Sequence, residues 1–474
     1  MSIGSILNTA REAMAAQQIA VKVTSQNIAN ATTEGYSKQR VELQAALPTV
    51  FPFGSVGTGV AVAGITRARD ALLDAAYRTD AAGAAAADAS STTLSQIQSV
   101  FGEPSDTGLS ASLDAFWSAW SDLSSDPTNS SAKSVVRQAG ANLASTLNRF
   151  ASQLDQLDQF NREGLNSDVG QVNTLTKQIA ELNNRIVSAE SNNQTANDLR
   201  DQRDLLLDKI TKITGGQVVE HANGSVAVFA GGRMLVDDTT VKQLEVYDGQ
   251  PPTINYAGTT TAIAGIGGTL GARLDVSATQ IPMVMSKLDA LTQNLVQSVN
   301  AIHSTGTTFS GNPPVAGAAG NFFDVTNPPP AGTDPRLTAR GIRLAPTLAG
   351  ADDVAAAGAG ATGPGNNDAA LALANLRTTA MSLTSLAGST TATLNDFFNE
   401  TVGGVGTAVQ QAQDESTVQS TLASNADNRR SAVSGVSTDE ELISVIEHQH
   451  AYQAAARLVS VVDDMTKTLV NLGL

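Results

Sequence analysis

Two histidines beside a glutamate, Glu447, His448 and His450, are the residues of this chain whose types come nearest to metal chemistry. Imidazole and carboxylate groups are common ligands of zinc. The surrounding pattern is helical, however, and residues two apart on a helix point about 200° away from each other, so they cannot share one ion from one face. We therefore expect a solvated or interfacial role for these side chains and no metal site.

A glycine-rich stretch, Gly265 to Gly271, resembles a phosphate-binding loop in composition. The Gly-x-Gly-x-x-Gly fingerprint fails because Leu270 takes the place of its third glycine, and no βαβ unit with an acidic residue follows. We expect a flexible connection between a strand and a helix instead. No Ser/His/Asp arrangement or carboxylate pair stands out, and the chain has no cysteine, so the sequence predicts neither an enzyme nor a cofactor.

Composition narrows the classes of partner. The 474 residues suggest roughly three domains. Acidic residues outnumber basic ones 45 to 29, and no basic stripe is present, so nucleic acid is not an expected partner. The chain lacks an apolar run of about 18 residues, so no membrane span is expected. Met1 to Ala20 lacks the basic and apolar regions of a secretory signal peptide, so export would need a route without a cleaved signal.

The elements that organise the chain lie at its two ends. From Thr438 to Leu474, apolar residues recur at helical spacing, and Ser437–Glu440 and Thr438–Glu441 each fit a capping box at the start. The stripe of this helix consists of Leu442, Val445, Gln449, Tyr452, Ala456, Val459, Val462, Thr466 and Leu469. The N-terminal stripe has heptad spacing. It consists of Ile3, Leu7, Ala10, Met14, Gln17, Val21, Thr24 and Ile28.

Two interpretations of these helices stay open on the pattern alone. They are either two core helices of a globular bundle or a coiled coil of the two chain ends whose outer face packs against neighbouring subunits. An exposed stripe of alanine, valine and leucine must be buried, disordered or chaperoned. We therefore expect residues 1–46 and 436–474 to be mobile in a lone subunit.

The segments between the ends are nested. Thr93 to Ile213 is helical in pattern, and both tryptophans, Trp117 and Trp120, fall in one apolar stripe that indicates a packed core. Gln217 to Tyr256 alternates and carries Asn-Gly and Asp-Gly turns, as strands do. Thr305 to Pro364 is rich in glycine and proline with short apolar pieces. The sequence predicts an elongated, multidomain, mainly α fold with β insertions.

The expected boundaries follow from these changes of pattern. Helix should return near Ser277, and a last helical segment should begin at Asp368 with a break around Gly403 to Gly406. The four units expected are a terminal coiled coil of 1–46 and 436–474, a helical rod of 47–214, 277–304 and 366–435, a β insertion of 215–276, and a second small β and loop insertion of 305–365.

A turn motif follows the first helix. Asn30 is expected to end the helix in the left-handed conformation, and Gly35 to take a positive φ. The motif residues are Asn27, Ile28, Asn30, Thr33, Gly35, Tyr36 and Gln39. They resemble the Asn-Ile-Ala-Asn-x-x-Thr-x-Gly-Tyr signature of the bacterial flagellar rod, hook and hook-associated proteins. Ser434 to Leu469 resembles the C-terminal signature of the same family.

Further positions favour the hook-associated members of that family. Ser37, Lys38 and Gln39 follow the tyrosine, whereas rod and hook proteins usually have a lysine directly after it; Lys38 replaces the usual arginine and keeps the charge. The stretches Gly57–Val60, Arg67–Asp70, Asp201–Asp204, Asn300–Gly306 and Phe322–Phe323 also look like those of the hook-associated proteins. The resemblance spans nearly the whole chain and is weakest over Thr305 to Pro364.

The resemblance implies a structural adaptor between flagellar hook and filament. The paired terminal helices would build the inner tube, the helical domain the next shell, and the β insertions would face outward. Its partners would be copies of itself, in a ring of about eleven subunits, the hook protein and the next hook-associated junction protein. A cytoplasmic chaperone would shield the C-terminal helix, and the flagellar type III apparatus would export the chain to the extracellular flagellum.

Three alternatives remain beside this hypothesis. A hook or rod subunit would polymerise many times over and be far more abundant in each flagellum. A surface binding module could be carried by the β insertions. An enzyme, such as a cell-wall hydrolase on a flagellar scaffold, would need residues that the sequence does not offer.

Overall fold

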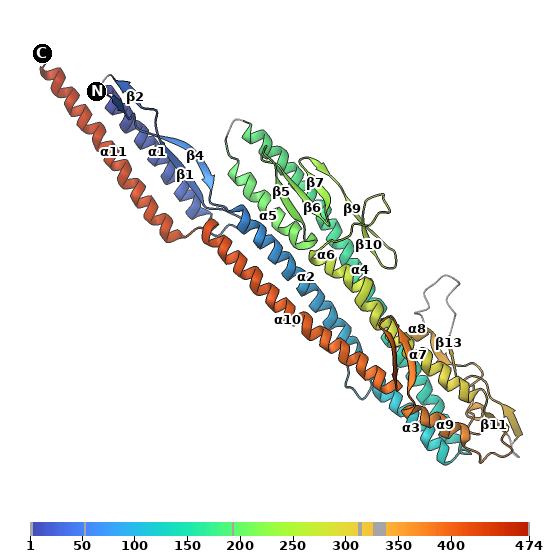
Figure 1. Ribbon diagram of the computed structural model, residues 1–474. Helices are drawn as coiled ribbons and strands as arrows, with labels where there is room; N and C mark the ends of the chain where they lie inside the picture. The colour runs from blue at the N-terminus through green and yellow to red at the C-terminus, as the bar shows by residue number, and fades with distance from the viewer. Residues whose placement is uncertain (1–2, 52–53, 192–193, 311–314, 326–337, 473–474) are drawn as a thin grey trace.

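The computed structural model describes residues 3–51, 54–191, 194–310, 315–325 and 338–472. The molecule is an elongated rod, and both chain ends lie at the same end of it (Figure 1). The expected mainly α fold with β insertions and paired terminal helices is confirmed.

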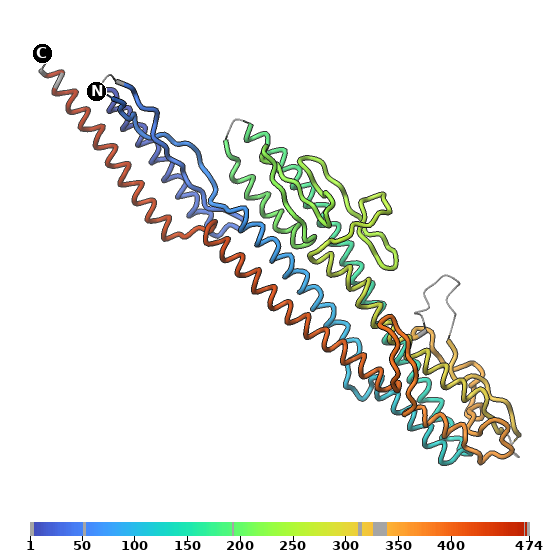
Figure 2. Tube along the Cα trace, in the orientation of Figure 1, coloured from blue at the N-terminus to red at the C-terminus, as the bar shows by residue number. Residues whose placement is uncertain are grey.

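The first layer is the pair of terminal helices, α1 (Ile3–Ala29) and α11 (Thr438–Leu472). They pack side by side and run in opposite directions (Figures 1 and 2). A hairpin of β1 (Gln39–Ala45) and β4 (Val60–Arg67) returns along α1, and its tip carries the short pair β2 (Thr49–Phe51) and β3 (Gly54–Val56). The two chain ends thus form one unit.

A second antiparallel pair, α2 (Ala71–Phe101) and α10 (Leu394–Ser434), continues the rod. The Asp70 side chain starts α2 by accepting hydrogen bonds from the backbone N–H groups of Leu72 and Leu73. Gly102 ends it in the left-handed conformation, with φ 55°. Both ends of α2 are therefore capped in the usual way.

The distal end of the rod is a helical core. It is built from α3 (Leu109–Ser125), the first part of α4 (Ser130–Glu190), α7 (Ile281–His303), α9 (Asp368–Asn375) and the distal half of α10. Its centre is aromatic: Trp117, Trp120, Phe116 and Phe322 are fully buried, and the Phe116 and Phe322 rings lie 5.6 Å apart. The expected packed core around the two tryptophans is confirmed.

The second β insertion joins this helical core. Its strands pair as β11 (Thr307–Ser310) with β12 (Val315–Ala318) and β13 (Phe323–Val325) with β14 (Ile342–Leu344), beside the short helix α8 (Thr338–Gly341). Phe322, Phe323 and Ile342 are buried among the helices. The insertion therefore shares the core of the rod.

The first β insertion has a core of its own. A four-stranded antiparallel sheet is formed by β5 (Gln217–Glu220), β6 (Val226–Ala230), β7 (Arg233–Asp237) and β8 (Thr240–Val241), and β9 (Leu244–Tyr247) pairs with β10 (Thr253–Tyr256). These strands pack on α4 and α5 (Asn197–Thr214). Valine and isoleucine make up 11 of the 19 buried residues of this core.

Three expectations about helix boundaries were wrong. Helix returns earlier than Ser277, because α6 (Gly268–Asp275) and a π-helical segment, Val276–Gln280, precede α7. The segment from Asp368 is interrupted by a hairpin of β15 (Met381–Ser385) and β16 (Gly388–Ala392), turned at Gly388 with φ 116°. Finally, α10 is unbroken at Gly403 to Gly406, because buried Thr401, Val405 and Val409 hold it against the core.

Candidate functional site: the terminal element and its joint with the rod

The turn motif is organised around Asn27, which is buried in the last turn of α1. Its Oδ1 accepts hydrogen bonds from the Tyr36 hydroxyl at 2.9 Å and the Gln39 backbone N–H at 3.0 Å. Its Nδ2 donates to the Gln39 carbonyl at 2.9 Å and to Glu441 Oε2 at 2.8 Å. The full hydrogen-bonding capacity of one amide is used, so α1, β1 and α11 meet at a single side chain.

Glu441 is the contact of α11 with this motif. Its buried carboxylate accepts from Asn27 and forms an ion pair with Lys38 Nζ at 2.8 Å. The Ser437 hydroxyl lies 3.5 Å from the Glu440 backbone N–H at the start of α11. The second expected capping box, Thr438 with Glu441, is wrong in its assigned role, because the Glu441 side chain is committed to Asn27 and Lys38.

The rest of the motif shapes the turn. Gly35 takes the expected positive φ, 80°, and a Cβ there would approach Leu205 Cβ to 3.3 Å. Asn30 is not left-handed, since Asp238 is the one non-glycine residue with positive φ in the described ranges. Its Nδ2 instead donates to the Gln26 carbonyl, and its Oδ1 accepts from the Thr33 hydroxyl. Ile28 is half-buried on α1.

Tyr36 and Gln39 face a row of carboxylates on α5. Gln39 Nε2 donates to Asp198 Oδ1 at 3.0 Å. Burial, together with the negative charges of Asp198, Asp201 and Glu441, raises the pKa of Tyr36 to about 12. The phenol therefore stays protonated and continues to donate to Asn27 at physiological pH.

The predicted residues of the C-terminal stripe do not all lie at the helix pair. Val462 is buried, and Val445, Tyr452, Ala456 and Val459 are half-buried against α1. Leu442 is 51% exposed and Gln449 is exposed, so these two lie off the interface; the side chain of Leu469 is outside the described residues. The interface is rotated from the predicted stripe because Glu441, His448 and Ala455 are at its centre.

Polar contacts fix the register of the helix pair. His448 Nδ1 lies 2.8 Å from Gln17 Oε1, and Gln18 Nε2 donates to the Tyr452 hydroxyl at 3.3 Å. His448 is therefore interfacial, whereas His450 is exposed. Together with the Asn27–Glu441 bond, these contacts align α1 and α11 in antiparallel register.

The outer face of α11 carries a row of exposed apolar side chains between charged ones such as Glu447 and Arg457. At 100° per residue, these apolar side chains point away from α1. They are Leu442, Ile443, Ile446, Leu458, Val461 and Met465, each about half exposed. A row of exposed apolar side chains of this kind usually marks a surface that contacts another chain.

Below the terminal element, a joint of buried ion pairs connects it to the rod. Arg67 Nη1, at the end of β4, lies 2.8 Å from Asp201 and 2.7 Å from Asp204 on α5. Arg69 pairs with Asp74 at 2.7 Å and with Asp204 at 3.3 Å. Burial alone would raise the pKa of Asp204, but the charges of Arg69, Arg67 and Arg78 lower it, so this carboxylate is ionised in the fold.

The joint extends to α2 and α10. Asp208, one turn after Asp204 on α5, accepts from Arg78 Nε at 2.7 Å and from Arg430 Nη1 at 2.6 Å. The Arg430 guanidinium stacks 3.6 Å over the Tyr77 ring. Strand β4, α2, α5 and α10 therefore meet in one charge network.

A second polar hub holds the distal insertion. Asn300, near the end of α7, accepts through Oδ1 from the backbone N–H groups of Phe322 and Phe323 and donates to the Phe323 carbonyl. His303 is fully buried, with Nδ1 at 2.7 Å from the Gly320 carbonyl and Nε2 accepting from the Ala355 N–H at 3.1 Å. Burial lowers the pKa of His303, so the ring is neutral.

The motifs first considered for chemistry have other roles. The glycine-rich stretch is a connection only over Gly265 to Gly267, because Gly268 and Gly271 belong to α6; the Gly267 N–H donates to the Thr214 carbonyl at 2.9 Å. Its glycines let α6 approach the end of α5 closely. Within the described residues no group of three or more His, Cys, Asp or Glu could hold a metal, and no helix is long and apolar enough to cross a membrane.

The partners in the joint were not predicted from the sequence. Ser37 donates through its backbone N–H and hydroxyl to Asp201, at 3.0 and 2.7 Å. The family resemblance singled out Ser37, the Arg67–Asp70 stretch and the Asp201–Asp204 stretch, but not their pairing. Three aspartates at i, i+3 and i+7 on α5, residues 201, 204 and 208, were the available signal for one acidic helix face.

Comparisons with known proteins agree with this architecture. Residues 94–323 match the family model of the flagellar hook-associated protein FlgK helical domain. Residues 7–36 match the flagella basal body rod protein model, and residues 430–472 match the C-terminal model of the flagellar basal body rod FlgEFG proteins. The matches to the two rod models coincide with α1 and its turn and with α11.

Whole-chain relatives extend the match. Flagellar hook-associated protein 1 of Bacillus subtilis is 31% identical over 98% of this chain and 97% of its own length. Its counterpart in Salmonella typhimurium is 27% identical over 69% of this chain and 60% of its own length. The solved structure of the flagellar hook junction protein FlgK from Burkholderia pseudomallei shares the fold, with a TM-score of 0.64 over 76% of this chain and all of that one, at 19% identity.

The nested rod, the paired terminal helices and the 31% sequence identity over 98% of the chain lead to one assignment. This chain belongs to the flagellar hook-associated protein 1 family.

Proposed function

We propose that this chain is the structural adaptor that joins the flagellar hook to the filament and that it assembles through α1 and α11. The observation that carries the proposal is the exposed apolar row on α11, which faces away from α1, the helix against which α11 packs. In an assembly, neighbouring copies would cover this row. Each Å² of apolar surface removed from water would stabilise the assembly by roughly 25 cal/mol.

The domain layout supports the same proposal in adjusted form. We assign residues 1–46 and 436–474 to assembly, and we shorten the first β insertion to residues 215–267 because helix begins at Gly268. The second insertion, 305–365, becomes an outer part of the rod core. The β insertions would face outward, away from the axis.

The partners proposed are those that the family resemblance implied. They are further copies of this chain in a ring of about eleven, the hook protein and the next hook-associated junction protein. An export chaperone would cover the outer face of α11 in the cytoplasm, and type III export would deliver the chain to the extracellular flagellum. We propose no enzymatic activity.

Single charged substitutions on α11 test the proposal. Leu458→Glu places a carboxylate in the exposed row, and Leu371→Glu makes the same change on α9, where leucine is exposed to a similar degree, 47% against 51%. Expressed in cells that lack the wild-type chain, L458E should give hooks without filaments, whereas L371E should give normal filaments. Normal filaments with L458E would contradict the role of this face.

The position of the chain in the flagellum separates an adaptor from a hook or rod subunit. Immunogold labelling of isolated flagella should place the chain in one narrow band at the hook–filament boundary. Labelling along the whole hook would contradict the adaptor role and favour the polymerising alternative.

A further inference from the structure

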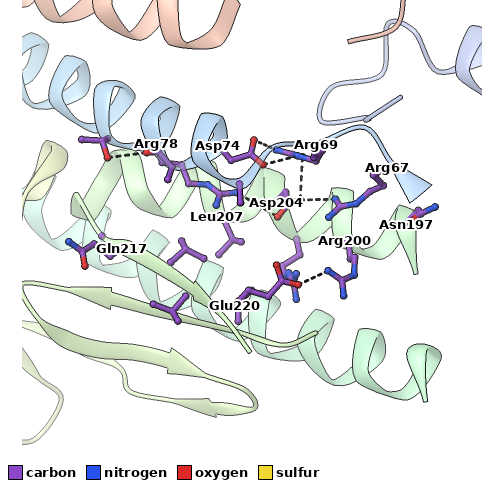
Figure 3. Close-up of a pocket in the computed structure, with 18 of the residues that line it drawn as sticks. Arg67, Arg69, Asp74, Arg78, Asn197, Arg200, Asp204, Leu207, Gln217 and Glu220 are labelled. Carbon is purple, nitrogen blue, oxygen red and sulfur yellow. Dashed lines mark hydrogen bonds and ion pairs between the residues drawn. The ribbon is translucent and has the colours of Figure 1, made fainter. Parts of the chain in front are cut away.

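A cleft of about 690 Å³ lies where the first β insertion meets the rod. Figure 3 shows Arg67, Arg69 and Arg78 on one side of it and Gln217 and Glu220 of β5 on the other. Its volume falls within the range of small-molecule sites. The cleft lies beside the ion pairs of the joint, and the assembly face of α11 has no part in it.

Five arginines line the cleft, and four of them are neutralised. Arg67, Arg69 and Arg78 pair with aspartates of α2 and α5, and Arg200 pairs with Glu190 and Glu220 at 2.6 Å each. The fifth is Arg203, which is 1% exposed. Its Nη1 donates to two uncharged oxygens, Asn183 Oδ1 at 3.2 Å and the Gly224 carbonyl at 2.6 Å.

Arg203 is therefore an incompletely compensated cation inside the protein. No carboxylate of the described chain lies within ion-pair distance of its guanidinium. Burial lowers the pKa of Arg203 to about 10; Asp204 and Glu220 oppose this, while Arg200 and Arg67 add to it. A buried charge in this situation is costly unless a counter-charge reaches it.

Buried polar atoms without partners gather around the same cleft. Six buried side-chain nitrogen or oxygen atoms of the described residues lack a hydrogen bond, and three of them belong to residues that line it: Arg78 Nη2, Asn197 Oδ1 and Arg203 Nε. Arg78 Nη2 lies 3.5 Å from Asp204 Oδ1, so the two form an ion pair but no hydrogen bond. Buried polar groups are nearly always satisfied. Arg78 Nη2 and Arg203 Nε are donors and favour an anionic occupant, whereas Asn197 Oδ1 is an acceptor and does not contribute to this preference.

We propose that this cleft binds a small oxyanion of the phosphate class, with the buried Arg203 guanidinium as its principal counter-charge. A guanidinium matches phosphate oxygens in geometry, and charge-assisted hydrogen bonds are about twice as strong as neutral ones. The anion would neutralise Arg203 and tie α5 to the cleft walls formed by α2 and β5. The β insertion would then be held at a fixed position against the rod.

Substitutions at Val219 test the site without disturbing the core. Val219 lines the cleft and is 50% exposed, so a charged side chain there should fold normally. Val50, in β2 at the end of the rod where the chain termini lie and 78% exposed, is outside the cleft and provides the matched control for a change in net charge.

The experiment is calorimetric titration of the full chain with sodium phosphate at constant ionic strength and pH 7.5. The wild type should show one saturable site. Val219→Glu should weaken it by about tenfold and Val219→Lys should tighten it several-fold, because the added charge lies within a Debye length of the anion. Val50→Glu and Val50→Lys should leave it unchanged. Arg203→Met should abolish it, with circular dichroism confirming the fold.

Three outcomes would overturn the proposal. The first is the absence of saturable heat in the wild type, which would mean that water alone satisfies these groups. The second is an equal response of the Val219 and Val50 variants, which would indicate a general charge effect. The third is unchanged affinity in folded Arg203→Met. Failure here would leave the role of α11 untouched, because that is read from filament formation.

Discussion

The two ends of the rod use the same local device in opposite surroundings. Asn27 and Asn300 each sit near the end of a long helix and bind the backbone of the strand region that follows. Around Asn300 the chain packs Trp120, Phe322 and His303 into a closed core. Around Asn27 the register is fixed by hydrogen bonds, but the apolar outer face of α11 is open. The apolar core at the distal end is closed within one chain. At the terminal end the register of α1 and α11 is fixed, but the apolar side chains of α11 are only partly buried.

The largest expected difference between the ends is in core truncations. Phe322→Ala should cost about 3–5 kcal/mol of unfolding free energy, because it opens a cavity in the aromatic core. Val462→Ala, in the α1–α11 interface, should cost about 1 kcal/mol or less in the monomer, because its surroundings can relax. Urea unfolding followed by tryptophan fluorescence reports the distal core through Trp117 and Trp120, and circular dichroism reports the terminal helices as well. Equal midpoint shifts would remove the contrast between the ends.

The two hub asparagines should differ next most. Asn300→Ala leaves two buried backbone N–H groups without an acceptor and should cost about 2–4 kcal/mol. Asn27→Ala should change global unfolding by under about 1 kcal/mol and should instead accelerate amide exchange in α11, since it removes the bond to Glu441. Asn166→Ala, on the exposed side of α4, is the surface control. If Asn27→Ala destabilised the whole chain as strongly as Asn300→Ala, the terminal element would be part of the same cooperative unit.

Acid should act on the distal hub, through His303, and on the ion-pair joint, through Asp204, in separate pH windows. The folded pKa of His303 lies below the ordinary 6.5, so the unfolded chain takes up the proton first and stability falls as the pH drops below about 6.5. The folded pKa of Asp204 lies below 3.8, so the stability it provides is lost only as the pH falls below about 4.

His303→Gln keeps a donor and an acceptor but cannot titrate. Chemical unfolding measured from pH 7.5 to 5 should show a flatter pH dependence for this variant than for the wild type. Identical slopes for the two proteins would mean that His303 is not the titrating group.

The smallest expected effect in free energy concerns the terminal helices themselves. In a monomeric sample, amides of residues 1–46 and 436–474 should exchange faster than those of α4, because opening the terminal pair exposes little additional apolar surface. Glu441→Gln should speed exchange further in the first turns of α11, since the ion pair with Lys38 is lost. Strong protection of both ends in the monomer would refute this expectation.

The sequence was most informative where structure depends on local spacing. The heptad steps from Ile3 and the stripe from Leu442 predicted both terminal helices, and alternation predicted the strands of 217–256. The turn motif singled out Asn27 through its family resemblance but gave none of its contacts. Contacts between residues far apart in the sequence could not be predicted. Asn27 and Glu441 are separated by 414 positions, and Ser37 and Asp201 by 164.

The errors have identifiable physical causes. Leu442 and Gln449 fit a helical stripe as well as the true interface residues do, because periodicity gives a face but not its rotation about a partner. The hairpin at 381–392 was missed because its short threonine- and serine-rich strands lie between two helical patterns. Gly403 and Gly404 weaken helix propensity, but tertiary packing of neighbouring positions outweighs this.

The pairing of α1 with α11 has a consequence for the order of events on the ribosome. Ile3–Ala29 is synthesised early, but the helix that completes it, Thr438–Leu472, emerges more than four hundred residues later. The first β insertion can fold in the meantime, since its core runs from Leu165 to Leu270. The rod core also needs α9 and α10, which are synthesised shortly before α11. An incomplete chain therefore cannot present the finished helix pair, and translation itself delays the segment that we propose for self-association.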